Sequence, residues 1–370
     1  MKNFPVARPF IDRKDIDGVV GVLKSGLLSF GPKYLQFEKQ IAKYTGTRYA
    51  CAVSNGTCGL HLAVKALNLH PGDEVITSPF SFISSSNCLL FEGVVPRFID
   101  IQENTFNMDP KYLDKSVTKK TKAILAVHIF GQSADMTEIM AFARRHHLPV
   151  IEDSCESLGS RYMGKMTGSI GDVGVYAFYP NKQMTTGEGG IVVTKSKKIR
   201  DICVSLRNQG RNNRNDWLVH ERVGYNYRMD EMSASLGITQ LHKLNWMINE
   251  KRKIASWYSS ELDGHRSIRV PRIGVNRTHS WFVYVIRVTN GSRDKIIKKL
   301  ERENIFTKPY LPVIHLQPFM KQMFHYKKGA FPIAEKISSQ TLALPFYIGL
   351  TREDVAYISR KLISVIKNYD

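Results

Sequence analysis

The sequence predicts an α/β protein that combines a mostly parallel central sheet with a smaller C-terminal α+β domain. From about residue 48 to residue 195, short apolar runs alternate with helical patterns. The strands of a parallel sheet are buried on both faces, so they form continuous apolar runs separated by helices. Beyond this region the pattern changes to one alternating strand, two helices and a proline-rich stretch. We therefore expect a large domain at residues 1–245, which includes an N-terminal arm, and a small domain at residues 246–370.

The predicted strands and helices differ in the spacing of their apolar residues. Continuous apolar runs predict strands at residues 50–53, 75–77, 95–99, 123–127, 148–151, 173–178 and 190–194. Apolar residues three or four positions apart predict helices at residues 59–67, 83–92, 136–146 and 229–262. In the small domain, the predicted elements are a strand at residues 281–288 and helices at residues 294–304 and 355–368. Ligand sites of such proteins lie beyond the carboxyl ends of the strands.

The composition argues against several classes of protein. Hydrophobic residues make up 43% of the chain, as in a packed globular protein. The net charge of +20 is compatible with a nucleic-acid partner. The basic residues are spread along the chain, however, and no RRM, zinc-finger or KH signature accompanies them. A basic surface that faces solvent is therefore the better explanation, and we expect no nucleic acid to bind.

The apolar runs, the N-terminal residues and the cysteines of the sequence bear on the membrane, the compartment and metals. No apolar run is long enough to span a membrane, and the N-terminus lacks the apolar region of a secretory signal. We therefore expect a cytoplasmic protein without a membrane partner. The five cysteines form no C-x-x-C pair and lack the spacing of metal ligands. They are expected to be reduced thiols, and we expect no metal site.

Lys182 is the most informative residue because of its surroundings. It lies between an aromatic apolar run and a Gly-rich turn, in the stretch from residue 176 to residue 190. Upstream, a predicted buried strand ends in Glu152 and Asp153. A lysine amine can form a Schiff base with pyridoxal phosphate, and an aspartate can keep the pyridine nitrogen of that cofactor protonated. A single lysine is usually a surface residue, but this pairing favours a pyridoxal phosphate site with Lys182 as its catalytic residue.

Two further segments could hold the same cofactor. Amides at a helix N-terminus bind phosphate, so the strand-to-helix turn that contains Gly56 and Thr57 is a candidate phosphate cradle. A helix N-cap formed by Ser54 or Thr57 explains the same residues equally well. Phe82 follows the next predicted strand and could stack on the pyridine ring. The hydrophobic core is the commoner location for a phenylalanine.

Five other polar residues remain open to two interpretations. Glu156 could reach the phenolic oxygen of the cofactor, or it could be a surface residue of a helix. Asn226 and Arg228 are donors suited to phosphate, or parts of a capping loop. His315 lies in a proline-bounded loop and could touch the substrate, although a structural histidine is at least as plausible. His128, at the end of a predicted strand, is undecided between a ligand contact and a structural role.

Taken together, these motifs resemble the DegT/DnrJ/StrS sugar aminotransferases, which have the aspartate-aminotransferase fold, also called fold type I. The matching segments follow the family order from Arg8 to about Leu244. They are residues 28–32, 37–38, 53–57, 71–76, 151–153, 158–159, 171–172, 181–182, 187–190 and 224–228. Each motif alone is weak, but their order is specific. The resemblance implies that the large domain binds pyridoxal phosphate and that the small domain is α+β.

The resemblance also implies a role for single residues at the cofactor. Lys182 would hold the cofactor covalently, and Asp153 would pair with its pyridine nitrogen. Gly56 and Thr57 would hold the phosphate, and Phe82 would stack on the ring. These assignments agree with what the residue types and their positions at strand ends suggest.

Other positions bear on partners and specificity. By the resemblance, Asn226 would reach the phosphate of the neighbouring subunit's cofactor, which implies a homodimer with shared active sites. Arg228 and His315 are expected to contact the substrate. Glu156 stands where many members carry Gln or His, which resembles the perosamine-synthase branch. Ala177 stands where many members have a phosphate-binding serine, so one usual hydrogen bond should be missing.

The reaction implied by the resemblance is transamination. An amino group would pass from L-glutamate to a nucleotide-linked keto sugar, expected to be a 4-keto-6-deoxyhexose. A 3-keto-sugar aminotransferase and a pyridoxal-phosphate-dependent sugar 3-dehydratase are the alternatives among enzymes. The dehydratase branch replaces the lysine with histidine, so Lys182 argues against it. The alternative from another class is a DNA-binding regulator with a degenerate aminotransferase fold, and intact Lys182 and Asp153 argue against that.

Overall fold

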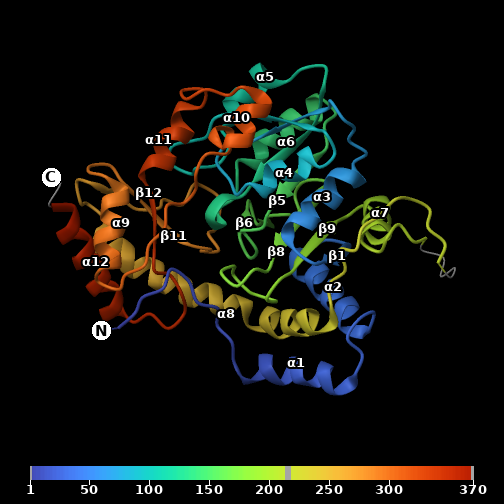
Figure 1. Ribbon diagram of the computed structural model, residues 1–370, viewed down its shortest axis with the longest axis horizontal. Coiled ribbons are helices and arrows are strands. Elements are labelled where there is room, and N and C mark those ends of the chain that lie inside the picture. The colour runs from blue at the N-terminus through green and yellow to red at the C-terminus, as the bar shows by residue number, and fades with distance from the viewer. Residues whose placement is uncertain (1, 213–217, 368–370) are drawn as a thin grey trace.

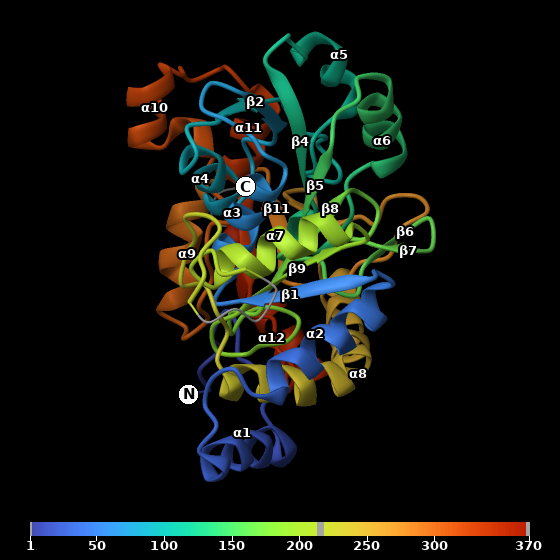
Figure 2. The same ribbon diagram turned by 90° about the vertical axis from the view of Figure 1, so that its right-hand side faces the viewer.

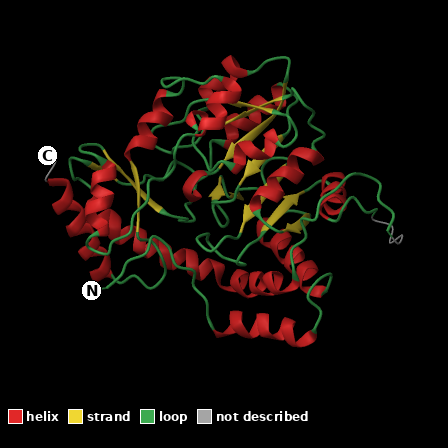
Figure 3. Ribbon diagram, in the orientation of Figure 1, coloured by secondary structure: helices red, strands yellow, loops and turns green. Residues whose placement is uncertain are grey.

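The computed structural model describes residues 2–212 and 218–367, and a mixed sheet lies at its centre (Figures 1 and 3). Within these residues the sheet has seven strands. In spatial order they are β1 (Tyr49–Val53), β9 (Gly190–Thr194), β8 (Val173–Ala177), β5 (Val150–Asp153), β4 (Thr121–Val127), β2 (Glu74–Thr77) and β3 (Val95–Phe98). The predicted α/β class and the existence of each predicted strand of the large domain are confirmed.

In this sheet β9 alone runs against its neighbours. It pairs antiparallel with both β1 and β8, whereas the remaining strand pairs are parallel. Because β9 is reversed, β1 and β8 point in the same direction, and their carboxyl ends meet at one edge. Gly190 is in register with Val53 on one side and with Ala177 on the other. The predicted mostly parallel sheet is therefore confirmed, and its reversed strand draws two strand ends together.

Both faces of the sheet are buried under helices (Figure 2). Four of these are α3 (Gly56–Ala66), α7 (Lys197–Arg207), α2 (Pro32–Thr45) and α8 (Glu231–Leu262). In β9, Val192 packs in one apolar cluster with α3 and α7, and its neighbour Ile191 packs in another with α2 and α8. Because successive side chains of a strand point to opposite faces, both faces need apolar residues. This explains the continuous apolar runs in the sequence.

Smaller elements surround the large sheet and form two further sheets, one of two strands and one of three. Around the central sheet lie α4 (Ser84–Leu90), α5 (Leu113–Ser116), α6 (Met136–Arg145), β6 (Arg161–Tyr162) and β7 (Lys165–Met166). In the C-terminal part lie β10 (Ile268–Arg269), β11 (Tyr284–Val288), α9 (Arg293–Glu301), α10 (Pro318–Phe324), α11 (Pro332–Gln340), β12 (Thr341–Leu344) and α12 (Arg352–Lys367). β10, β11 and β12 form an antiparallel sheet. The smaller C-terminal α+β part is therefore confirmed.

Two N-terminal helices were missed by the sequence prediction, although their start signals are present. α1 (Arg13–Ser25) begins at a capping box, in which the side chains of Asp12 and Asp15 each accept from the other's backbone N–H. α2 begins at Pro32, which directly follows Gly31. α1 lies along α8 (Figure 1), and Asp15 accepts a hydrogen bond of 2.6 Å from Thr239 Oγ1. The capping residues alone are a sufficient sequence signal for the start of α1, so its contact with α8 was not needed to predict it.

Two predicted boundaries differ from the structure for identifiable reasons, and a third cannot be compared. α3 begins at Gly56, because Asn55 caps it by accepting a hydrogen bond from Cys58 N. The two N-caps considered from the sequence, Ser54 and Thr57, are therefore wrong. The strand predicted from residue 281 begins at Tyr284, because Trp281 has a positive φ of 53°, which interrupts extended backbone. The predicted end of the last helix, residue 368, lies outside the described residues.

α8 links the two parts of the molecule without a break. It extends through residues 245 and 246, so the predicted division into two domains at that point stays a prediction. One stretch of α8 packs with the large sheet, and another packs with the C-terminal elements, where Tyr258 donates to Pro345 O at 2.8 Å. Among the helices of the described ranges, none is both long and apolar enough to cross a membrane.

We expect Gly190→Ala to destabilise the protein, because a Cβ at this position would lie 2.5 Å from Asn55 O and 2.8 Å from Gly56 N. These are backbone atoms that cannot move aside easily, so the loss should be about 1–3 kcal/mol in the free energy of unfolding. The control is Gly21→Ala in α1, where a Cβ meets nothing within 4 Å. There, helix propensity predicts a gain of about 0.5–1 kcal/mol. Urea unfolding would measure both, and equal effects would contradict the close approach.

Candidate active site

The turn between β1 and α3 forms one wall of the site. Gly56 is the first residue of α3, and a Cβ placed on it would lie 2.7 Å from the Ala177 Cβ and 3.1 Å from the Cys155 Sγ. Only glycine fits this approach without displacing β8. The first amides of a helix have no partners within the helix, and the helix dipole makes this end positive. The geometry therefore suits a phosphate group, as the sequence predicted.

Thr57 and Phe82 lie at the same edge of the sheet. The Thr57 and Ser84 hydroxyls are 2.7 Å apart and share a hydrogen bond, which links α3 to the start of α4. Phe82 exposes 59% of its surface, so the interpretation that it belongs to the core is wrong. An exposed ring at the carboxyl edge of the sheet is free to contact a planar ligand. Its stacking on a cofactor ring stays a prediction.

Asp153 ends β5 and has a fixed orientation. Its side chain is buried, with Oδ2 accepting a hydrogen bond of 2.6 Å from Ser85 Oγ and Oδ1 accepting one of 3.2 Å from Cys155 N. Ser85 in turn shares a hydrogen bond of 2.7 Å with Ser81. A carboxylate held in this way can pair with a protonated ring nitrogen. The serines were not identified from the sequence, since nothing in the run of residues 84–86 shows which hydroxyl faces the strand end.

Lys182 lies on the loop that joins β8 to β9, beside a buried carboxylate. Its Nζ is 3.4 Å from Glu156 Oε1 and 4.1 Å from the centroid of the Phe282 ring. The other oxygen of Glu156 accepts a hydrogen bond of 2.9 Å from Phe130 N. Glu156 is 7% exposed, so the interpretation that it is a surface residue is wrong. Burial raises the pKa of Glu156, and the charge of Lys182 offsets part of that rise.

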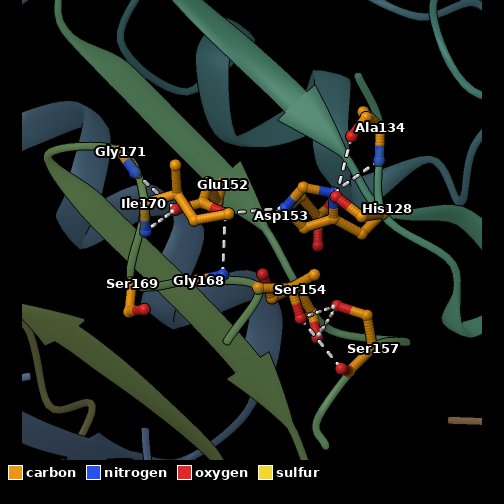
Figure 4. Close-up of polar contacts among 12 residues, drawn as sticks. His128, Ala134, Glu152, Asp153, Ser154, Ser157, Gly168, Ser169, Ile170 and Gly171 are labelled. Atoms are coloured by element: carbon orange, nitrogen blue, oxygen red, sulfur yellow. Dashed lines mark hydrogen bonds and ion pairs between the residues drawn. The ribbon is translucent and has the colours of Figure 1, made fainter. Parts of the chain in front are cut away.

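Behind this site, His128 and Glu152 form a fully buried pair (Figure 4). His128 Nε2 lies 2.8 Å from Glu152 Oε2, and Ala134 N donates to His128 Nδ1 at 3.0 Å. Nδ1 therefore acts as an acceptor, so Nε2 carries the proton and donates to the carboxylate. Glu152 also accepts from the backbone amides of Gly168, Ile170 and Gly171. The open question about His128 is thus answered in favour of a structural role that fixes the end of β5.

Asn226 and Arg228 do not join the Lys182 cluster. The rings of Tyr225 and Tyr227 stack with their centroids 4.8 Å apart. Asn226, which lies between them in the sequence, is exposed. Arg228 donates to Asn208 Oδ1 at 2.9 Å. Arg228 also lines a separate cavity of about 70 Å³. Burial lowers the pKa of Arg228, with a further contribution from the charge of Arg211. Within one chain, these two residues contact none of the described residues around Lys182.

His315 is also outside the cluster. It is fully buried, its Nε2 lies 3.0 Å from Glu335 Oε1, and Phe331 packs edge-on against its ring. Burial lowers the pKa of His315. These contacts fit the structural histidine that the sequence left open. The expected substrate contacts of His315 and Arg228 stay predictions.

The residues at this edge of the sheet fit pyridoxal phosphate. A helix N-terminus without room for a side chain at Gly56 suits the phosphate, and Asp153 suits the pyridine nitrogen. Lys182 supplies an amine that lies close to Glu156. Ala177 has no hydroxyl to donate to a phosphate, and the loss of one usual hydrogen bond there stays a prediction. The fold and the site together define the class of protein: an aminotransferase of fold type I.

Comparisons with known proteins agree with this class. Residues 9–363 match the model of the DegT/DnrJ/EryC1/StrS aminotransferase family, and the chain belongs to that family. It is 36% identical to the GDP-perosamine synthase of Escherichia coli O157:H7, with 98% of each chain covered. It is 31% identical to UDP-N-acetyl-3-dehydro-alpha-D-glucosamine 3-aminotransferase of Acidithiobacillus ferrooxidans, covering 93% of this chain and 91% of the relative.

A solved structure supports the same fold. The PLP-form of the Spr1654 protein from Streptococcus pneumoniae superposes with a TM-score of 0.94 at 26% identity, with 99% of each chain covered. The family and this neighbour indicate dependence on pyridoxal phosphate. The predicted family, the predicted fold and the prediction of an aminotransferase are therefore confirmed.

We expect Ser85→Ala to weaken the binding of pyridoxal phosphate, because Asp153 would lose the hydroxyl that holds its Oδ2. One hydrogen bond of this kind contributes about 1 kcal/mol, which corresponds to roughly fivefold in the dissociation constant. The neighbouring Ser86 is equally buried, but its hydroxyl has no partner among the described residues. Ser86→Ala is therefore the matched control. Titration with the cofactor would separate the two, and an equal effect would contradict the orienting role of Ser85.

Proposed function

We propose that the protein transfers an amino group from L-glutamate to a nucleotide-linked 4-keto-6-deoxy sugar, with pyridoxal phosphate as its cofactor. One observation carries the proposal. Lys182 Nζ lies 3.4 Å from the buried Glu156, on the loop that follows β8, at the edge where β5 ends in Asp153. An amine, a ring-nitrogen partner and a phosphate cradle at one edge are the groups that this chemistry needs.

The roles proposed for the side chains follow from their positions. When bound, pyridoxal phosphate supplies an aldehyde that carries the amino group and a ring that accepts electrons. Asp153 would hold a proton on the ring nitrogen, because Ser85 keeps its carboxylate oriented. Lys182 would hold the cofactor and, once released, move a proton between the α-carbon of the donor and the cofactor. Glu156 would face the same amine and help to set its protonation state.

The choice of sugar is supported by Glu156 and by a named relative. Glutamate at this position resembles the perosamine-synthase branch, and a GDP-perosamine synthase is 36% identical over nearly the whole chain. A 3-keto sugar is the second candidate substrate, because a 3-aminotransferase is 31% identical over most of the chain. Lys182 weighs against a 3-dehydratase, in which histidine replaces the lysine. The intact pair of Lys182 and Asp153 weighs against a degenerate DNA-binding regulator.

We further propose a homodimer with shared active sites. Asn226 is exposed on one chain and away from Lys182, as a residue that serves a neighbouring site would be. Near it in the fold, Arg228 lies 5.2 Å from the centroid of the Phe30 ring, and Phe30 is 54% exposed. Other large apolar side chains on the same N-terminal segment are exposed: Leu27, Leu28 and Leu35. Such a surface is typical of a region that a partner covers.

Mixing two inactive variants would test the shared site. Lys182→Ala and Asn226→Ala should each lose most activity, for lack of the amine and of the phosphate contact respectively. If Asn226 serves the partner's cofactor, a mixed dimer contains one site with both native residues. Refolding the two variants together should then restore up to about a quarter of the wild-type activity, because half of the dimers are mixed and half of their sites are intact. A mixture as inactive as its components would contradict the shared site.

We expect Lys182→Ala to lose the visible absorbance band that forms when pyridoxal phosphate is added to the protein, because no amine is left to bind the aldehyde covalently. In the wild type, L-glutamate should convert that band to the form that carries the amino group. The control is Lys253→Ala, which removes an exposed lysine of α8 that pairs with Glu250. A wild type without any band would refute the proposed function.

A further inference from the structure

A small basic cavity borders Lys182. It measures about 20 Å³, and its walls come from the N-terminal segment, the loop that carries Lys182, and α8. Its polar and charged lining includes Arg8, Asn181, Lys182, Gln183, Gln240 and Lys251. Three of these side chains are cations, and no carboxylate is among the lining residues within the part of the chain that the structure describes. The cavity is therefore suited to an anion.

Lys251 is the least expected of the three cations. It lies in the middle of α8 and is 6% exposed. Its Nζ lies 5.7 Å from the centroid of the Phe346 ring, and it forms no hydrogen bond or ion pair with any described residue. Burial lowers the pKa of Lys251 to about 8, and the nearby charge of Lys182 adds to this. Placing a positive charge in a buried side chain without a partner is costly, and an anion bound in the cavity would lower that cost.

The size of the cavity limits what the anion can be. A single water needs a cavity of about 10–15 Å³. The cavity of about 20 Å³ therefore has room for one small polar group. The diphosphate of a nucleotide is far larger than this space, so a single small anionic group such as a carboxylate is the better match. Arg8 stacks over the Tyr347 ring at 5.4 Å, which holds its guanidinium near the cavity. Glu156 offsets only the charge of Lys182, so Arg8 and Lys251 remain for the ligand.

We propose that Lys251 and Arg8 bind a carboxylate group of the amino donor beside Lys182. The inference rests on the proposed function, in which an amino acid must place its amine at the reacting lysine. A carboxylate held in the cavity would put the rest of the amino acid next to Lys182. It would also neutralise a positive charge that the chain itself leaves unpaired. Lys251 is thus a substrate-binding residue for the first half of the reaction.

The test uses the full chain loaded with pyridoxal phosphate. The absorbance change on adding L-glutamate is followed at increasing concentrations, for the wild type and for Lys251→Met. The variant keeps the long apolar stem and loses the charge, so Lys182 should still form its band with the cofactor. Because a hydrogen bond to a charged group is lost, the half-saturating concentration of L-glutamate should rise about tenfold or more. Lys251→Arg should restore most of the wild-type response.

Controls separate this inference from a folding defect. Lys253→Met lies two residues away on the exposed side of α8 and should respond to L-glutamate as the wild type does. If Lys251→Met fails to fold, Arg8→Gln tests the same cavity. Acetate should compete with L-glutamate in the wild type and compete much less in Arg8→Gln. A wild type without any band refutes the proposed function itself. A wild-type response to L-glutamate in both Lys251→Met and Arg8→Gln overturns only the carboxylate site.

Discussion

The backbone of β9 passes so close to the turn between β1 and α3 that a side chain at Gly190 would overlap Asn55 O. Gly56, the first residue of α3, lies similarly close to Ala177 at the end of β8, so a side chain at Gly56 would overlap the Ala177 Cβ. These contacts exist because β9 runs against β1 and β8, which brings both strand ends to one edge. The helix N-terminus at Gly56, the carboxylate of Asp153 and the loop of Lys182 all lie at that edge. A change in the packing of β9 would therefore disturb the whole site together.

Three carboxylates within five residues act differently because their partners differ. Glu152 accepts hydrogen bonds from backbone amides and from His128, so it serves the structure. Asp153 is oriented by Ser85 and is the residue proposed to pair with the cofactor ring. Glu156 has a raised pKa from burial and faces Lys182. Chemically similar side chains thus gain distinct roles from the atoms around them, and the spacing along the chain alone would not separate these roles.

The charges around Lys182 are unequally matched. Glu156 compensates one cation, while Lys251 and Arg8 line the same cavity without a carboxylate among its described lining residues. If the proposed acidic donor binds there, its carboxylate would pair with these cations only in the first half of the reaction. The exposed apolar residues near Phe30 are a separate feature and bear on assembly. The two features carry separate proposals, one on the binding of the donor and the other on a second chain that completes the site.

The sequence by itself determined the α/β class and the positions of the strands of the large sheet, because these depend on local apolar patterns. It also predicted a cofactor site around Lys182 and Asp153 from residue chemistry. It also carried the signals for α1 and α2 in Asp12 and Pro32. Only the tertiary structure decided that Glu156 and His315 are buried, that His128 is structural, and that Lys251 reaches the cavity beside Lys182. Burial and charge pairing depend on segments that are distant in the chain. No local pattern specifies which of them will meet.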